Sequence, residues 1–223
     1  MGLDNYRTGS SYTIAQAAAL AGTSAQNVRR WLRGYEHENH RMEPLFGAAR
    51  EAPMLSFLDL AEVVVAARFR AYGGKLQKVR DAHEYARRQW PDLAYPFASL
   101  RLKVMGGEII HEFDEEYGGK PLAISLGGAQ FAMPGLVQEA LELFDFDEHD
   151  NMATRWFPAG RTVPIVIDPR FAGGRLAVVD RGVTVATIGL RFHKGKQSID
   201  FIARDLQLTR HQVEEALKLA DAA

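Results

Sequence analysis

The chain has 223 residues, enough for one large or two modest domains that bury a core without covalent crosslinks. It contains no cysteine, which excludes disulfides and thiolate metal ligands, and it has no apolar run of the length that a membrane span or signal peptide requires. Basic and acidic residues nearly balance, at 27 and 28, yet residues 1–104 carry a net charge of +5, residues 105–160 of −9 and residues 161–223 of +3. We therefore expect a cytoplasmic protein whose two ends, rather than its middle, can approach phosphate, although chance charge on a solvated surface is an alternative.

Two short helices are predicted near the N-terminus. Thr13 and Gln16 have the spacing of a capping box, which starts a helix that runs to about Leu20. Residues 21–23 include a glycine and break this helix, and Ser24 caps a second one. The apolar residues of the second helix share one face: Val28, Trp31 and Leu32.

Residues 34–53 have no sustained period and include two prolines, which predicts an irregular hairpin or wing. A longer helix is predicted from Ser56, with Asp59 in its first turn, to the glycines at 73–74. A further amphipathic helix is predicted over residues 76–89 and ends at Trp90-Pro91.

The middle of the chain mixes strand and helix patterns. The Gly106-Gly107 pair predicts a tight hairpin turn between two short β-like runs. The predicted elements are strands at 100–105, 108–113, 122–126, 154–157 and 163–167 and a helix at 135–144.

The chain ends in a second pair of capped helices. Ser198 caps the first, and Thr209 with Gln212 forms a capping box for the second. The two pairs are expected to differ in spacing and sequence, so no internal repeat is predicted. The fold class is α+β, with a winged helix-turn-helix at residues 1–95, a small acidic α/β middle region at 96–160 and a C-terminal helical, helix-turn-helix-like domain at 161–223.

The second N-terminal helix has the residue types of a DNA-reading helix. Arginine can bind guanine and glutamine can bind adenine through paired hydrogen bonds, and a serine at a helix start can meet a phosphate. The candidate DNA-binding residues are Ser24, Gln26, Asn27, Arg29, Arg30 and Arg33. The alternative is the arginine-rich exposed face that any soluble helix can carry.

The N-terminal segments 12–18 and 28–32 resemble the helix-turn-helix of MerR-like regulators, and segments 56–60 and 76–80 resemble the later helices of that family. The likeness covers roughly the first hundred residues. Because cysteine sensor ligands are absent, it does not extend to the metal-sensing members.

The last sixty residues resemble a small domain of uncharacterised function found in antitoxins. The likeness rests on residues 166–169, 173–175, Gly195 and Ser198-Ile199 together with residues 206–213. Two three-residue segments of this chain, 174–176 and 180–182, differ from the residues that the family usually has there. The combination with a MerR-like head resembles VapB-type antitoxins of type II toxin-antitoxin systems.

This resemblance implies a protein, not an enzyme, that neutralises a PIN-like ribonuclease toxin and represses its own operon by binding promoter DNA. A homodimer reading two half-sites is expected, because one recognition helix offers few base contacts. A toxin site built from carboxylates would be blocked by arginines of the basic tail, with Arg175, Arg181 and Arg191 as candidates.

Two other functions are compatible with the sequence. One is a stand-alone MerR-like transcription regulator whose acidic middle binds an effector, and the other is a hydrolase using Asp114 or Glu116. His37, His40 and His111 lack the spacing of metal ligands, and the aspartates at 145, 147 and 150 lack the glycine and glutamate of a calcium loop. No cofactor or metal is therefore expected.

Overall fold

The computed structural model describes residues 5–37, 40–46, 54–71, 76–101, 123–126, 129–132 and 139–221. The chain divides into two compact units. The N-terminal unit comprises Met1–Glu142 and Phe146–Ala153, and the C-terminal unit comprises Leu143–Asp145 and Thr154–Ala223. The fold is mixed α+β with an N-terminal domain of the helix-turn-helix type, as the sequence predicted.

Helices dominate the N-terminal unit, and its described strands form two-stranded antiparallel sheets. These sheets pair β1 with β4, β2 with β3 and β5 with β6. Its elements in chain order are α1 (Asn5–Thr8), β1 (Tyr12–Thr13), α2 (Ile14–Leu20), α3 (Ala25–Arg33), β2 (Tyr35–His37), β3 (His40–Met42), β4 (Met54–Leu55), α4 (Phe57–Ala71), α5 (Leu76–Gln89), the 3-10 turn η1 (Pro96–Ala98), β5 (Ala123–Leu126) and β6 (Ala129–Ala132).

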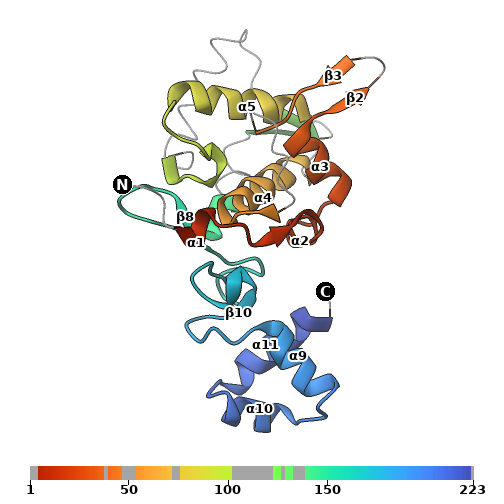
Figure 1. Ribbon diagram of the computed structural model, residues 1–223, viewed down its shortest axis with the longest axis vertical. Coiled ribbons are helices and arrows are strands. Elements are labelled where there is room, and N and C mark those ends of the chain that lie inside the picture. The colour runs from red at the N-terminus through yellow and green to blue at the C-terminus, as the bar shows by residue number, and fades with distance from the viewer. Residues whose placement is uncertain are drawn as a thin grey trace. The chain divides into compact units, whose positions relative to one another are not determined.

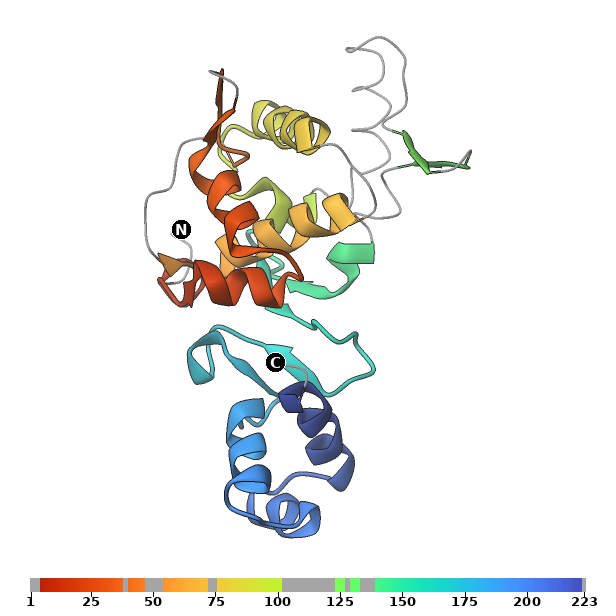
Figure 2. The same ribbon diagram turned by 90° about the vertical axis from the view of Figure 1, so that its right-hand side faces the viewer.

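The core of this unit is built around α4. Eleven of its fifteen residues are buried, as expected of a helix that is apolar on nearly every side. Ser56 and Asp59 close its start, because the Asp59 carboxylate accepts from the Ser56 N–H and the Ser56 hydroxyl accepts from the Asp59 N–H. Figure 2 shows α4 running through the middle of the unit, between α2 and α5.

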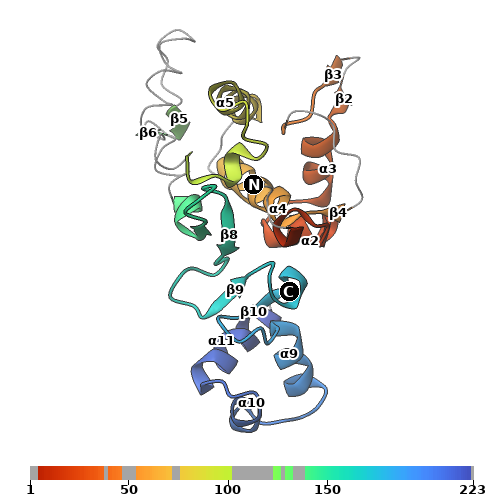
Figure 3. The ribbon, with the colours of Figure 1, turned by 60° about the vertical axis from the view of Figure 1, so that its left-hand side comes forward.

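The C-terminal unit joins a small antiparallel sheet to three helices. Within the described residues the strand order is β10, β9, β8, β7. The elements are β7 (Phe144–Phe146), β8 (Ala153–Trp156), β9 (Ile165–Ile167), the 3-10 turn η2 (Ala172–Gly174), β10 (Leu176–Val178), α9 (Val185–His193), α10 (Ile199–Asp205) and α11 (Arg210–Asp221). Figure 3 shows α9 and α11 side by side, with α10 at one end of them.

Apolar side chains from the sheet and from all three helices form the core of the C-terminal unit. Its buried members include Ile165, Val178, Ile188, Ile202, Val213, Ala216 and Leu217. Gly189 of α9 lies against α11, where an added Cβ would come within 3.0 Å of Ala220 Cβ. The glycine therefore sets the close approach of these two helices.

Several sequence predictions need correction. The predicted helix 135–144 is wrong at its C-terminal end, because residue 144 begins strand β7, and the predicted strand 163–167 is shorter, at Ile165–Ile167. Strands β6 and β10 and helix α9 were not predicted. The predicted strand at 100–105 is wrong at its start, because residues 100 and 101 are helical, and the rest of the predicted hairpin to residue 113 lies outside the described residues.

The predicted difference in spacing between the two helix pairs is also wrong. The first helix of each pair has seven residues, and the N-cap of the second helix follows the N-cap of the first by eleven positions, from Thr13 to Ser24 and from Ser198 to Thr209. The two pairs thus repeat one backbone pattern, although most of their side chains differ.

Candidate nucleic-acid interface

Helix α2 is capped at both ends through hydrogen bonds with the residues that directly flank it. The Gln16 side chain accepts from the Thr13 N–H at 2.9 Å, and the Thr13 hydroxyl accepts from the Gln16 N–H at 3.2 Å. At the other end Gly22 has φ +67°, and the Thr23 N–H donates to the Ala18 carbonyl at 2.9 Å. This left-handed turn directs the chain into α3.

Helix α3 has a buried and an exposed side, as predicted. Val28, Trp31 and Leu32 are at most 2% exposed and pack into the core of the N-terminal unit. Figure 1 shows α3 joined to α2 by a short turn and leading into the β2–β3 hairpin. The exposed side carries Gln26, Asn27, Arg29, Arg30 and Arg33. One surface thus gathers three arginines and two amide side chains.

Local contacts order part of this exposed side. The Ser24 hydroxyl accepts from the Asn27 N–H at 3.1 Å, and the Asn27 side-chain amide donates to the Thr23 hydroxyl at 3.2 Å. The Arg30 guanidinium lies 4.9 Å from the centre of the Tyr35 ring, at the start of the hairpin. Ser24 and Asn27 therefore stabilise the start of α3, and Tyr35 positions Arg30.

The predicted wing is a two-stranded hairpin with Tyr35 opposite Met42. Gly34 ends α3 with φ +73°, and a Cβ at this position would collide with the Met42 carbonyl. The Leu45 N–H donates to the Trp31 carbonyl at 2.7 Å. The hairpin is thus fastened to the C-terminal end of α3.

Helix α5 contacts the segment after β3 and helix α4 through buried polar groups that were not predicted from the sequence. Arg80, only 7% exposed, donates to the Glu43 carbonyl at 2.7 Å. His83 and Glu62 are fully buried and lie 3.2 Å apart, and the Glu62 carboxylate also accepts from the Phe97 N–H. The one sequence signal for this pair is an acidic residue inside the otherwise apolar helix α4.

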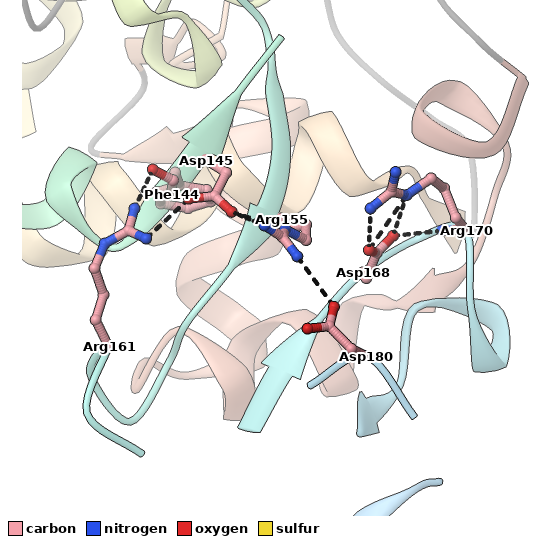
Figure 4. A network of polar contacts seen from close by, with 7 residues as sticks. All are labelled: Phe144, Asp145, Arg155, Arg161, Asp168, Arg170 and Asp180. Carbon is pink, nitrogen blue, oxygen red and sulfur yellow. Dashed lines mark hydrogen bonds and ion pairs between the residues drawn. The ribbon is translucent and has the colours of Figure 1, made fainter. Parts of the chain in front are cut away.

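The three aspartates considered for calcium binding make protein contacts instead. Asp150 forms a two-point ion pair with the buried Arg7, at 2.7 and 3.1 Å. Asp145 contacts two arginines, Arg155 and Arg161 (Figure 4). The backbone N–H groups of His149 and Asp150 hydrogen-bond to Asp147 and lower the pKa of its carboxyl. Among the described residues, no group of three or more metal-ligating side chains occurs.

The three arginines predicted to meet a toxin lie on different elements of the C-terminal unit. Arg175 and Arg181 are exposed and lie in the loops that flank β10, and Arg175 donates to the Ala172 carbonyl at 2.9 Å. Arg191 belongs to α9, where it donates to Gln197 and pairs with Asp205, each at 2.6 Å.

Comparisons with known proteins agree with this architecture. A family described as "Putative DNA-binding HTH domain" matches residues 10–83, and a family described as "Protein of unknown function (DUF433)" matches residues 165–220. The chain therefore carries a helix-turn-helix domain of the DNA-binding type followed by a DUF433 domain. Neither description names an antitoxin or a MerR-like regulator, so both of these assignments stay predictions.

One similar solved structure is the crystal structure of Rv2018 from Mycobacterium tuberculosis. It is 23% identical, with a TM-score of 0.70, over 93% of this chain and 96% of that chain. At this identity the likeness shows the fold alone. No curated protein matches the chain.

Within the part of the chain that the structure describes, we find no helix with the length and apolar character needed to cross a membrane.

Proposed function

We propose that this protein is a transcription regulator that reads promoter DNA through α3 and serves as the antitoxin of a type II toxin-antitoxin system. The observation that carries the proposal is the division of α3 into a buried side and an exposed side with Arg29, Arg30 and Arg33. A recognition helix needs this division, because one side must hold it in the domain while the other enters the major groove.

The exposed residues of α3 divide into two groups by the DNA contact they suit. Arg30 and Arg33 suit paired hydrogen bonds to guanine, and Gln26 suits adenine. Ser24 and Asn27 lie at the start of α3, where backbone N–H groups attract a phosphate. Arg29, at the edge of the exposed side, suits the sugar-phosphate backbone, which sets register rather than sequence.

We expect a protein with one short recognition helix to bind DNA as a homodimer. One helix of nine residues offers few base contacts, and a two-fold pair reading half-sites about 34 Å apart multiplies them. The operator is therefore expected to be palindromic.

The antitoxin part of the proposal rests on the likeness of the C-terminal residues to the domain found in antitoxins. In this function the protein covers the active site of a PIN-like ribonuclease encoded by the neighbouring gene and represses the operon that encodes both. The N-terminal unit supplies DNA binding, and the C-terminal unit supplies toxin binding.

Binding of the full-length protein to a labelled fragment of its own promoter tests the DNA function. Arg30→Ala and Arg33→Ala should each weaken binding by about 1–3 kcal/mol, since each removes one paired contact. Affinity should also fall steeply with salt as phosphate contacts release counterions. Lys218→Ala is the matched control, because Lys218 occupies the position of Arg33 in the second helix pair. Unchanged affinity in both arginine variants would contradict the proposal.

Copurification with the product of the neighbouring gene tests the antitoxin function. We expect a stable complex that lacks ribonuclease activity. If no complex forms and a small molecule changes promoter affinity instead, the protein is a stand-alone regulator.

A further inference from the structure

Among the described residues, three large apolar side chains are strongly exposed, and all belong to the C-terminal unit: Phe171 (52%), Leu190 (61%) and Phe201 (49%). Leu190 and Phe201 project from helices α9 and α10. Phe171 instead lies in the loop before β10, and its surroundings differ in two respects.

The first respect is that the loop around Phe171 is held in one shape. The Phe171 N–H donates to the Asp168 carbonyl at 3.0 Å, and the Gly174 N–H donates to the Phe171 carbonyl at 2.9 Å. Three successive residues, 172–174, have positive φ angles. The Asp168 side chain, 6% exposed, accepts from the backbone and the guanidinium of Arg170, as Figure 4 shows. Phe171 is thus preorganised, so that little conformational entropy is lost if it enters a pocket.

The second respect is that one arginine lies against the ring and two more are exposed in the adjoining loops. The Arg170 guanidinium lies 5.6 Å from the ring centre. Arg175 reaches back to the carbonyl of the next residue, Ala172. A Cβ on Gly182 would lie 3.9 Å from Phe171 Cβ, which brings the loop containing Arg181 to the same place. We call these four residues, Arg170, Phe171, Arg175 and Arg181, the Phe171 surface.

We propose that the Phe171 surface docks a folded protein partner whose contact site is an apolar pocket with a rim of carboxylates. Aromatic and arginine side chains dominate the binding energy of protein interfaces, and an aromatic anchor inside a charged rim is the usual arrangement. Charge complementarity favours an acidic rim on the partner, because Arg170 lies against the ring and Arg175 and Arg181 are exposed in the two neighbouring loops.

Nucleic acid fits this surface less well than protein. Asp168 already neutralises Arg170, and Asp180, 80% exposed, lies 3.6 Å from Arg155 (Figure 4) and precedes Arg181 in the sequence. A phosphate backbone would be repelled by this exposed carboxylate.

The inference deepens the proposed function by naming the surface that holds the toxin, and its test uses the product of the neighbouring gene as the probe. Phe171→Ala in the full-length protein should weaken binding of this probe about tenfold or more, as loss of a central anchor does. Arg175→Glu and Arg181→Glu should each weaken it several-fold. Phe201→Ala is the matched control, since it removes an equally exposed phenylalanine from the same unit, and it should leave the affinity unchanged.

The thermal midpoint and promoter affinity of each variant identify the cause of any change. An unchanged midpoint and promoter affinity together with weakened probe binding supports the inference. Equal loss in Phe171→Ala and Phe201→Ala, or no loss in Phe171→Ala, overturns it while the antitoxin function stands. Weaker promoter binding in the Phe171 variant would make the surface a nucleic-acid site and overturn it as well. If the wild-type protein does not bind the probe, the antitoxin function and this inference fall together, whereas promoter binding by α3 is judged by its own variants.

Discussion

Two regions of the molecule, α2–α3 in the N-terminal unit and α10–α11 in the C-terminal unit, follow the same backbone plan 185 positions apart. Thr13 and Ser198 cap the first helices, and Ser24 and Thr209 cap the second ones. Four positions keep the same residue: Ile14 and Ile199, Ala18 and Ala203, Val28 and Val213, and Leu32 and Leu217. All eight are buried or partly buried, so the shared pattern is one of packing.

The turns between the helices also agree. Gly22 has φ +67° and Gln207 has φ +55°. The residue after each donates its N–H to the first helix, from Thr23 to Ala18 at 2.9 Å and from Leu208 to Ala203 at 2.8 Å. A helix-turn-helix backbone therefore forms with or without glycine at the left-handed position.

The charged residues of the second helices differ, because exposed arginines in α3 correspond to partly buried glutamates in α11. Arg29 and Arg30 of α3 correspond to Glu214 and Glu215 of α11. In α11 Glu215 pairs with Lys218 at 2.6 Å and Glu214 with Arg210 at 2.8 Å, so its basic groups are neutralised within the helix. The comparison teaches that caps and buried residues specify the motif, whereas the exposed side decides whether the motif can meet DNA.

The largest expected effect comes from exchanging these charges. The double variant Arg29→Glu, Arg30→Glu should weaken promoter binding by about 2–6 kcal/mol, roughly 30-fold or more, because one backbone contact and one base contact are lost. The reciprocal variant Glu214→Arg, Glu215→Arg should leave promoter affinity within about twofold of wild type. Fluorescence anisotropy with a promoter fragment measures both. Gain of affinity in the reciprocal variant would mean that α11 also lies at the DNA.

The next effect concerns packing. Trp31→Ala should reduce the free energy of unfolding by about 3–5 kcal/mol, because a side chain that is 2% exposed leaves a cavity. The corresponding position in α11 is Ala216, and Ala216→Gly should cost only about 1 kcal/mol through helix propensity. Urea denaturation measures the loss of unfolding free energy in both variants. Similar losses would show that the two second helices are anchored alike.

The turns give a smaller pair of effects with opposite signs. Nothing lies within 4 Å of a Cβ at Gly22. Gly22→Ala should therefore reduce the free energy of unfolding by about 1–2 kcal/mol, through the strain of a positive φ alone. Gln207→Gly should stabilise the protein by up to about 1 kcal/mol, because it removes such strain. Thermal unfolding distinguishes the two, and a loss of stability in Gln207→Gly would contradict the shared turn geometry.

The smallest expected effect is a change in the pKa of Glu215. The hydrogen bond from Lys218 lowers the pKa of Glu215. Since the folded-state pKa is depressed, the ion pair stabilises the folded protein above the unfolded glutamate pKa, about 4.3. This stabilisation is lost as the pH falls through the lower folded-state pKa. Lys218→Ala should return the pKa toward that ordinary value, as followed by NMR of the Glu215 carboxyl carbon. An unshifted titration would show that the ion pair does not persist in solution.

Local signals explain why much of the fold was predictable. Capping residues lie within three positions of the groups they satisfy, so Thr13, Ser24, Ser56, Ser198 and Thr209 marked five helix starts. The buried side of α3 followed from helical spacing alone. The exposed arginines of α3 were predicted for the same reason, because placing one side in the core leaves the other outside.

Contacts between distant segments were not predictable. Arg7 meets Asp150 across 143 positions, and β10 exists through its pairing with β9. Helix α9 contains a glycine at position 189 that a local propensity argument counts against a helix, yet the close approach of α11 at Ala220 makes the small residue suitable. The Phe171 surface was missed in part because its aromatic residue gives no periodic signal, although Arg175 and Arg181 were noted.

Hydrogen exchange of the full-length protein with and without a saturating promoter fragment tests most directly which helix pair meets DNA. We predict slower exchange across residues 24–37, which include α3 and the first strand of the hairpin, and no change across α11. Slower exchange in α11 with none in α3 would contradict the account.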